Sequence, residues 1–262
     1  MRPYSRVYAT VNLDAVASNM KSMRENLPAS TLIMGSVKAD GYGHGSVPIA
    51  KTIEPYVFGY AVATIDEGII LRRHGINKTI LILGVTHESQ YEELLRYDIR
   101  TAMFQYEKAK KLSDLAVKQG KKAVVHLALD TGMSRIGMKA DREHAKEAAA
   151  IAALEGIEVE GLFTHFARAD ETDKSAYEEQ YRRYKEFLGY LEELGVQIPI
   201  RHCSNSAGIV ESLESNHMDM VRAGIAIYGM YPSDEVDHNS VKLTPAMEIK
   251  SCITYIKEIG AC

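Results

Sequence analysis

The sequence predicts an α/β fold, a (β/α)₈ TIM barrel, and three observations point to it. Short apolar runs, often rich in β-branched residues, alternate eight times with amphipathic stretches along the 262 residues. Runs of this kind are typical of parallel strands that are covered on both faces. The length also suits a single barrel domain with a large core. A doubly wound open sheet is the alternative, but the glycines at 41, 43 and 45 lack the spacing of a dinucleotide-binding turn.

The eight predicted strands follow one another at regular intervals. They cover Leu32–Val37, Val57–Thr64, Thr79–Leu83, Ile99–Phe104, Ala123–Leu129, Val159–His165, Ile198–His202 and Met220–Tyr228. The intervening helical spacing of apolar residues is clearest at Gln105–Lys118, Glu143–Leu154 and Ser175–Leu194. Glycines stand where helix C-caps are expected, at Gly120, Gly156 and Gly195.

Two further segments read as strands outside the eight units. Val7–Asn12 precedes the first helix, and Met247–Ile259 alternates apolar and polar residues after the last barrel unit. We expect the second of these to lack a partner and to open a β-rich domain that the chain does not contain. The predicted organisation is an N-terminal strand at 1–12, a barrel at 13–243 and the beginning of a truncated β-domain at 244–262.

Composition excludes several classes of partner. A net charge of −4 gives no global reason to bind nucleic acid or an anionic membrane. No apolar run approaches the ~20 residues of a membrane span, and the N-terminus lacks a signal-peptide core. Three widely spaced cysteines, Cys203, Cys252 and Cys262, suggest a reducing compartment and hence a cytoplasmic protein. His202-Cys203 has no second ligand pair at a suitable spacing, so we expect no metal site.

The stretch Ser36–Gly45 carries the first chemical signal. Lys38 ends an apolar run and is followed by three glycines, Tyr42 and His44. An amine held against an apolar strand is disfavoured as a cation, so its pKa falls and the nucleophilic neutral form becomes accessible. A lysine that forms Schiff bases has this requirement. Glycine N–H groups and the Tyr42 hydroxyl would suit a phosphate at the same place.

Polar residues also follow the other predicted strands. Reacting groups in a (β/α)₈ barrel lie at the C-terminal ends of its strands, which brings together Lys38, Arg135, His165, Asn205-Ser206 and Arg222–Gly224. The loops after strands seven and eight, the usual phosphate site of this fold, supply hydroxyls and a glycine backbone. Taken singly, Arg135 could form a surface salt bridge and His165 could be a satisfied strand-end histidine. Their combination at one rim predicts an anion-binding site.

These residues carry a resemblance to the N-terminal part of alanine racemase, a pyridoxal 5′-phosphate enzyme of fold type III. The resemblance spans almost the whole chain, and its first and last stretches are the most specific. The matching stretches are Val37–Gly45, Leu129–Gly137, Gly161–Phe166, Asn205–Ala207 and Val221–Gly229. It implies an isomerase that interconverts L- and D-alanine for cell-wall precursor supply, with an amino-acid substrate and a homodimeric full-length form.

The resemblance also implies a role for each matching side chain. Lys38 is expected to bind the cofactor carbonyl and to act as the base on one face of the substrate α-carbon. Arg222 should face the pyridine nitrogen and, because an arginine keeps its proton, leave the ring a weaker electron sink. Arg135 should lie near the cofactor phenolic oxygen and the substrate carboxylate, and His165 should brace the ring and Arg222. The other expected cofactor-binding residues are Tyr42, Asn205, Ser206, Gly224, Ile225 and Tyr228.

Three departures from the family pattern affect these expectations. Ala128 stands where many members carry a carbamylated lysine that orients the arginine, so either something else positions Arg135 or the role of Arg135 is weaker. Ala223 replaces a proline that is common after Arg222. Full-length members continue into a β-domain whose tyrosine reaches the partner subunit's active site as the opposite-face base, and we expect that base to lie outside this chain.

Other functions stay open at this stage. A barrel that binds pyridoxal phosphate but turns over little is the main alternative, and serine could replace alanine as substrate. A fold-type III decarboxylase shares the lysine-alanine start of the motif, but that class generally places an acidic residue at the pyridine nitrogen. Glycoside hydrolysis would need two strand-end carboxylates, and no such pair stands out.

Overall fold

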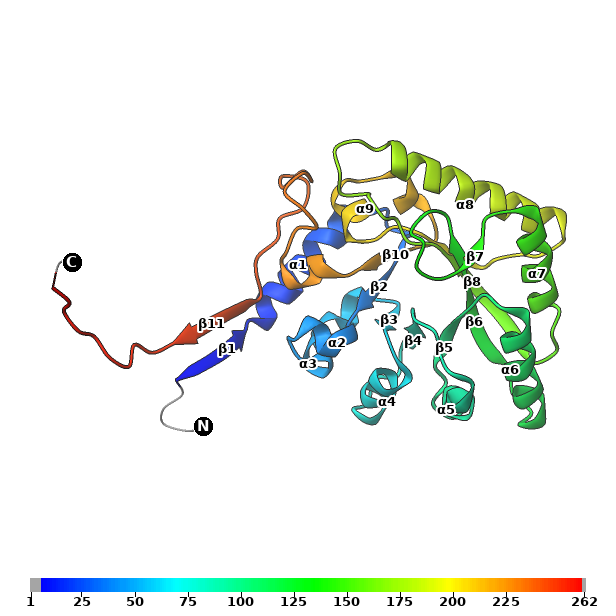
Figure 1. Ribbon diagram of the computed structural model, residues 1–262, viewed down its shortest axis with the longest axis horizontal. Helices are drawn as coiled ribbons and strands as arrows, with labels where there is room; N and C mark the ends of the chain where they lie inside the picture. The colour runs from blue at the N-terminus through cyan, green and yellow to red at the C-terminus, as the bar shows by residue number, and fades with distance from the viewer. Residues whose placement is uncertain (1–5, 261–262) are drawn as a thin grey trace.

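Eight parallel strands form the barrel in the computed structural model, which describes residues 6–260 (Figure 1). They lie in the order β10-β2-β3-β4-β5-β6-β8-β9. The Arg222 N–H donates to the Ser204 carbonyl (3.0 Å) across the seam between β9 and β10, so the barrel is nearly closed. The predicted (β/α)₈ barrel is confirmed. The strands are β2 (Leu32–Ser36), β3 (Gly59–Val62), β4 (Thr79–Ile82), β5 (Arg100–Met103), β6 (Ala123–Asp130), β8 (Ile157–Phe163), β9 (Ile200–His202) and β10 (Met220–Ala223).

The last barrel strand is shorter than its sequence predicts. The apolar run Met220–Tyr228 was expected to be one strand, but β10 ends at Ala223 and Ile225–Tyr228 forms the 3₁₀ helix η4. Ser206 explains the break, because its Oγ accepts the N–H groups of Gly224 (2.9 Å) and Ala226 (3.3 Å). These backbone donors are therefore turned away from a strand ladder.

Helices cover the outside of the barrel (Figure 1). The three predicted most clearly are found as α6 (Tyr106–Lys118), α7 (Arg142–Ala152) and α8 (Ser175–Glu193). No helix within residues 6–260 is long and apolar enough to cross a membrane. The others are α1 (Leu13–Glu25), α2 (Lys38–Tyr42), α3 (Ser46–Ile53), α4 (Ile65–Arg73), α5 (Tyr91–Tyr97) and α9 (Ser206–Val210), with 3₁₀ turns η1 (Glu54–Tyr56), η2 (Glu88–Gln90) and η3 (Glu214–His217).

The three predicted cap glycines divide into two kinds. Gly120 and Gly195 follow α6 and α8 in the left-handed region, with φ of 63° and 75°, as C-cap glycines do. Gly156 is not a cap of this kind. A Cβ at Gly156 would lie 2.3 Å from the Ser113 carbonyl oxygen, so glycine is required there because two backbone segments approach closely.

A two-stranded ribbon extends away from the barrel (Figure 1). It consists of β1 (Val7–Val11) and β11 (Met247–Ser251), which pair antiparallel with Val7 opposite Ser251 and Val11 opposite Met247. The expectation that the C-terminal strand has no partner is therefore wrong. The strand predicted for 247–259 also ends early, at Ser251, which lies opposite Val7. Residues 1–5 of the predicted N-terminal strand and Cys262 lie outside the described residues.

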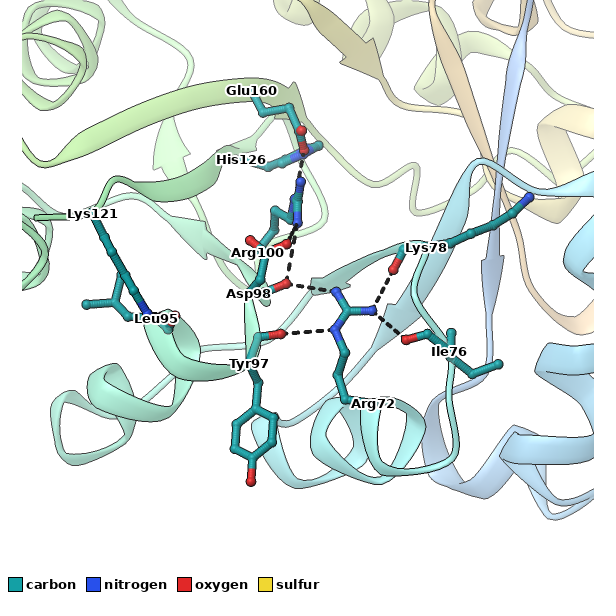
Figure 2. Close-up of polar contacts among 10 residues, drawn as sticks. All are labelled: Arg72, Ile76, Lys78, Leu95, Tyr97, Asp98, Arg100, Lys121, His126 and Glu160. Carbon is teal, nitrogen blue, oxygen red and sulfur yellow. Dashed lines mark hydrogen bonds and ion pairs between the residues drawn. The ribbon is translucent and has the colours of Figure 1, made fainter. Parts of the chain in front are cut away.

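Basic side chains tie together the N-terminal end of the barrel (Figure 2). Arg72 at the end of α4 donates to the carbonyls of Tyr97 (2.9 Å), Ile76 (2.8 Å), Lys78 (2.7 Å) and Asp98 (2.8 Å). Cations commonly satisfy free carbonyls at helix C-termini in this way. These contacts hold the C-terminal ends of α4 and α5 to the start of the neighbouring strand.

Candidate active site

A cavity of about 350 Å³ opens at the C-terminal ends of the strands. Eight of the ten residues predicted for the site line it, which is the convergence expected of strand ends in a barrel. Arg135 and Tyr228 are the two that do not. The lining residues are Ser36, Lys38, Tyr42, Leu83, Met133, His165, Phe166, Ala167, Asp170, Asn205, Ser206, Ala207, Arg222, Gly224, Ile225 and Pro232.

Lys38 stands between the end of β2 and a left-handed turn. Ala39, Asp40, Gly41 and Tyr42 all have positive φ, between 50° and 62°. This conformation costs L-residues about 1–2 kcal/mol each, so local hydrogen bonds must hold it. The Gly41 N–H donates to the Val37 carbonyl (2.8 Å), and the Gly43 N–H donates to the Ala39 carbonyl (3.0 Å). The turn fixes the backbone directly after Lys38.

Glu67 on α4 holds this turn to the neighbouring strand end. Its two carboxylate oxygens accept the Ala39 N–H and the Ala63 N–H, each at 2.7 Å. The motifs that predict the site do not include this residue. Thr64-Ile65-Asp66-Glu67 has the pattern of a capping box, which could have drawn attention to it. In a capping box, however, the glutamate returns to its own cap, whereas Glu67 bridges two strand ends.

Burial and nearby charges act on the Lys38 amine. Burial lowers the pKa of Lys38, the positive charges of Arg135 and Arg222 lower it further, and the Glu67 carboxylate opposes them. The Tyr42 ring lies 6.0 Å from Nζ. The shift has the direction expected from the sequence, and it favours the neutral, nucleophilic amine.

Hydroxyl groups and a glycine backbone form a cradle beside Lys38. Because Ser206 Oγ accepts two backbone N–H groups, its own hydrogen is left to donate to a ligand. A Cβ at Gly224 would lie 3.4 Å from the Tyr42 hydroxyl and 3.6 Å from Ser206 Oγ. Glycine thus leaves open the space on which both hydroxyls converge. A bound anion such as a phosphate fits this donor set.

Arg222 lies at the back of the cavity, almost fully buried. Its Nη2 donates to the carbonyls of Thr164 (2.6 Å) and Cys203 (3.2 Å) and to His165 Nδ1 (3.3 Å). Burial lowers the pKa of Arg222 to about 10, which still leaves it charged at neutral pH. Burial, together with the charges of Arg222, Arg135 and Lys38, lowers the pKa of His165 to about 3. His165 is therefore a neutral hydrogen-bond acceptor for Arg222.

Arg135 lies beside the main cavity rather than in it. It lines an adjoining space of about 20 Å³ that shares Met133, His165 and Arg222 with the main cavity. Within the described part of the chain, no hydrogen bond or ion pair is found for the Arg135 side chain. Ala128 is buried in an apolar cluster with Ala102 and Phe163. The structure thus provides no side chain at position 128 that could orient Arg135.

Tyr228 packs behind a cavity residue, and Asn205 caps a helix at the cavity. The Tyr228 hydroxyl donates to the Ser36 carbonyl (2.9 Å), and its ring packs on Tyr42 (centroids 4.9 Å apart) and His44 (4.6 Å). Tyr228 therefore lies behind Tyr42 and outside the lining of the cavity. Asn205 caps α9, since its Oδ1 accepts the Gly208 N–H (3.1 Å), and it also lines the cavity.

His202 and Cys203 form no metal site with other described residues. Among residues 6–260, no three His, Cys, Asp or Glu side chains are placed to hold a metal ion. Burial raises the pKa of the Cys203 thiol to about 12. His202 instead accepts a hydrogen bond from Arg222, a contact that strand spacing alone could not predict.

The fold and the site together define a (β/α)₈ barrel with a ligand cavity at its C-terminal mouth, lined by a lysine, an arginine and a hydroxyl cradle. The family model described as "Alanine racemase, N-terminal domain" matches residues 11–232. The chain belongs to this family.

Individual relatives agree with this membership. The chain is 43% identical over 256 residues to an alanine racemase of Desulforamulus reducens, covering 97% of this chain and 69% of that protein. It is also 43% identical to an alanine racemase of Clostridium perfringens, covering 97% and 65%. The structure of an alanine racemase of Clostridium difficile 630 in complex with cycloserine matches with a TM-score of 0.95 at 41% identity, over 98% of this chain and 71% of that one. The chain thus spans about two thirds of the length of these relatives.

Proposed function

We propose that the chain is the barrel of a pyridoxal 5′-phosphate-dependent racemase that interconverts L- and D-alanine. The observation that carries this proposal is a half-buried lysine of lowered pKa at the mouth of the barrel, flanked by arginines and a hydroxyl cradle. The donor set fits the cofactor: Lys38 for its carbonyl, and Tyr42, Ser206 and the Gly224-Ile225 backbone for its phosphate. The alanine racemases among the relatives support the choice of substrate.

The bound cofactor supplies electron withdrawal from the substrate α-carbon, which makes the α-hydrogen acidic. Arg222 would hold the pyridine nitrogen as a permanent cation, and would donate a hydrogen bond to it without giving up a proton. This restricts the electron withdrawal and favours racemisation over transamination. His165 keeps Arg222 in place by accepting from its Nη2.

Proton transfer at the α-carbon needs a group on each face. Lys38 is the proton acceptor on one face, since its lowered pKa leaves part of the amine neutral. A tyrosine of the partner subunit serves the other face, as the family resemblance implies. Arg135 binds the substrate carboxylate. Because nothing in the described residues anchors its guanidinium, the Arg135 contact contributes less than a fixed bidentate pair would.

The wider setting follows from the same proposal. The protein works as a homodimer in the cytoplasm and supplies D-alanine for the cell wall. The boundary near residue 243 separates the barrel from a β-domain that begins at 244. A barrel that binds the cofactor with little turnover is the second candidate function. Assays with D- and L-alanine, with serine as the competing substrate, distinguish these outcomes.

Reconstitution with pyridoxal phosphate tests the cofactor assignment. The protein is expected to gain an absorption band, and borohydride reduction is expected to add the cofactor mass to the peptide that contains Lys38. Lys38→Ala is expected to lose both signals. Lys51→Ala, at an exposed position of α3, is the matched control and is expected to retain them. A wild-type protein that shows no band and no mass addition would contradict the assignment.

A further inference from the structure

Two buried histidines connect Arg222 to a carboxylate elsewhere in the barrel. Arg222 Nη1 lies 2.9 Å from His202 Nδ1, and His202 Nε2 lies 2.8 Å from His126 Nδ1. His126 Nε2 lies 2.9 Å from Glu160 Oε2. Both imidazole rings are fully buried. The row begins at the active-site cavity and ends at Glu160 on β8, which Figure 2 shows beside His126 and Arg100.

The chemistry of the two ends fixes every proton in this row. A guanidinium can only donate, so His202 Nδ1 must be an unprotonated acceptor. A neutral His202 then carries its proton on Nε2 and donates it to His126 Nδ1. His126 must in turn carry its proton on Nε2, where the Glu160 carboxylate accepts it. A proton on either Nδ1 would place two donors face to face, so both rings are neutral in the Nε2–H tautomer.

Burial favours the same protonation states. Burial lowers the pKa of His126 despite the nearby Glu160 carboxylate, and burial with the charge of Arg222 lowers the pKa of His202 well below its ordinary value. Burial alone would raise the pKa of Glu160. The hydrogen bond from His126 and the charge of Arg100, whose Nε lies 3.5 Å from Oε2, outweigh it and hold that pKa below its usual range. Glu160 is thus an ionised acceptor.

Arg222 needs a remote partner of this kind. Its hydrogen bonds go to backbone carbonyls and to the rings of His165 and His202, and its guanidinium lies 5.5 Å from the centre of the Phe163 ring. No ion pair to a carboxylate is found for it within residues 6–260. A buried cation without a counter-charge is costly unless its hydrogen bonds are well made. Glu160 is the carboxylate at the far end of its hydrogen-bonded row.

The backbone makes room for the row. A Cβ at Gly161 would lie 2.4 Å from His126 Nδ1, so only glycine lets the His126 ring occupy this place. The β6–β8 register also shifts between Val125 and His126, which is where the row crosses from one strand to the other. Both features belong to the strands that carry His126 and Glu160.

We propose that Glu160 is a positioning residue for Arg222, acting through the tautomers of His126 and His202. The guanidinium requires an unprotonated His202 Nδ1, and the carboxylate gives the His126 Nε2–H that this arrangement creates its acceptor. Without Glu160 that buried donor is unsatisfied, and the row can relieve it only by shifting the proton to His126 Nδ1, at the expense of the contacts that hold Arg222. The role of Arg222 toward the cofactor rests on the proposed function, whereas the assignment of the two histidine tautomers is independent of it.

The test is ¹⁵N NMR of histidine-labelled protein without cofactor, with the two rings assigned from His126→Gln and His202→Gln. The wild type is expected to show Nδ1 unprotonated and Nε2 protonated in both rings near pH 7. Glu160→Gln retains an acceptor oxygen and should keep this pattern. Glu160→Leu removes the acceptor, and the Nδ1–H form of His126 should appear. Glu158→Leu, at an exposed position of the same strand, is the control and should leave both rings unchanged.

A second measurement connects the row to the cavity. Titration with pyridoxal phosphate should show about tenfold weaker binding for Glu160→Leu and near-normal binding for Glu160→Gln. Loss of a residue that orients a metal-binding histidine weakens metal binding on this scale, and we expect a similar effect here. A wild-type His202 protonated on Nδ1, or unchanged tautomers in Glu160→Leu, would overturn the proposal. If Glu160→Leu does not fold, the wild-type and Glu160→Gln spectra still test the proposal, because a His202 protonated on Nδ1 in either protein would overturn it. Failure of the wild type to bind pyridoxal phosphate would refute the proposed function and leave the tautomer test intact.

Discussion

Replacement of Glu67 by alanine tests how the backbone beside Lys38 is held. Its carboxylate accepts two backbone N–H groups at 2.7 Å, one directly after Lys38 and one directly after β3. Alanine removes both acceptors and leaves the strained left-handed turn at Ala39–Tyr42 without its tie to α4. We expect a loss of global stability and a change in the Lys38 amine from this one substitution.

The structure sets the size of the stability loss. A hydrogen bond to a charged group contributes about 1.5–3 kcal/mol when its loss leaves a buried partner unsatisfied. Ala39 is exposed and Ala63 is half-buried, so water can replace the carboxylate in part. About 1 kcal/mol for each bond gives a loss of about 2 kcal/mol in the free energy of unfolding. For a domain of this size, that corresponds to a fall of roughly 4–8 °C in Tm.

Urea denaturation and the pH dependence of Lys38 labelling measure the two effects. Because the Glu67 carboxylate raises the pKa of Lys38 against burial, its removal should lower that pKa further, and labelling should begin at lower pH. Asp66→Ala, at the exposed neighbouring position in the first turn of α4, is the control and should cost at most about 1 kcal/mol. A Glu67→Ala protein as stable as Asp66→Ala, with unchanged Lys38 labelling, would refute the reasoning.

Two further predictions concern stability. Burial lowers the pKa of His126, His165 and His202 in the folded state, so below about pH 6.5 the unfolded chain binds more protons than the folded one. The free energy of unfolding should therefore be highest above that pH and fall towards pH 3, by up to ~1.4 kcal/mol per pH unit for each histidine. Urea titrations that give the same stability from pH 7 to pH 4 would contradict this prediction. Ala39→Gly should leave the free energy of unfolding unchanged or raise it by up to about 1 kcal/mol, since glycine relieves the left-handed strain. Ala50→Gly, in the buried interior of α3, should lower it by at least about 1 kcal/mol. Equal losses of stability for the two variants in thermal denaturation would argue against strain at Ala39.

The barrel and the position of its cavity follow from local patterns. Buried strands read as apolar runs because both of their faces are covered, and helices show their own spacing, so each element can be recognised alone. Once the fold is a parallel barrel, all strand ends meet at one mouth, which places Lys38, His165 and Arg222 together without further information. This is why eight of the ten predicted site residues line the cavity.

The features that sequence reasoning missed depend on contacts between distant segments. β10 ends where Ser206 Oγ accepts the N–H groups of Gly224 and Ala226, although the mostly apolar run continues to Tyr228. β1 and β11 pair across almost the whole length of the chain. The left-handed turn begins at Ala39, a residue type with no preference for positive φ.

The direction of proton exchange at alanine tests the central claim, that Lys38 is the base on one face of the substrate. Protein consisting of residues 1–262, loaded with pyridoxal phosphate in deuterium oxide, should wash deuterium into D-alanine faster than into L-alanine, as followed by NMR of the α-proton. Loss of a positioned acid–base group costs about 10²–10⁴-fold, so net racemisation should lag behind this exchange by a similar factor. Lys38→Ala should abolish the exchange. Equal washout from both enantiomers with matching racemisation, or exchange that survives in Lys38→Ala, would contradict the account.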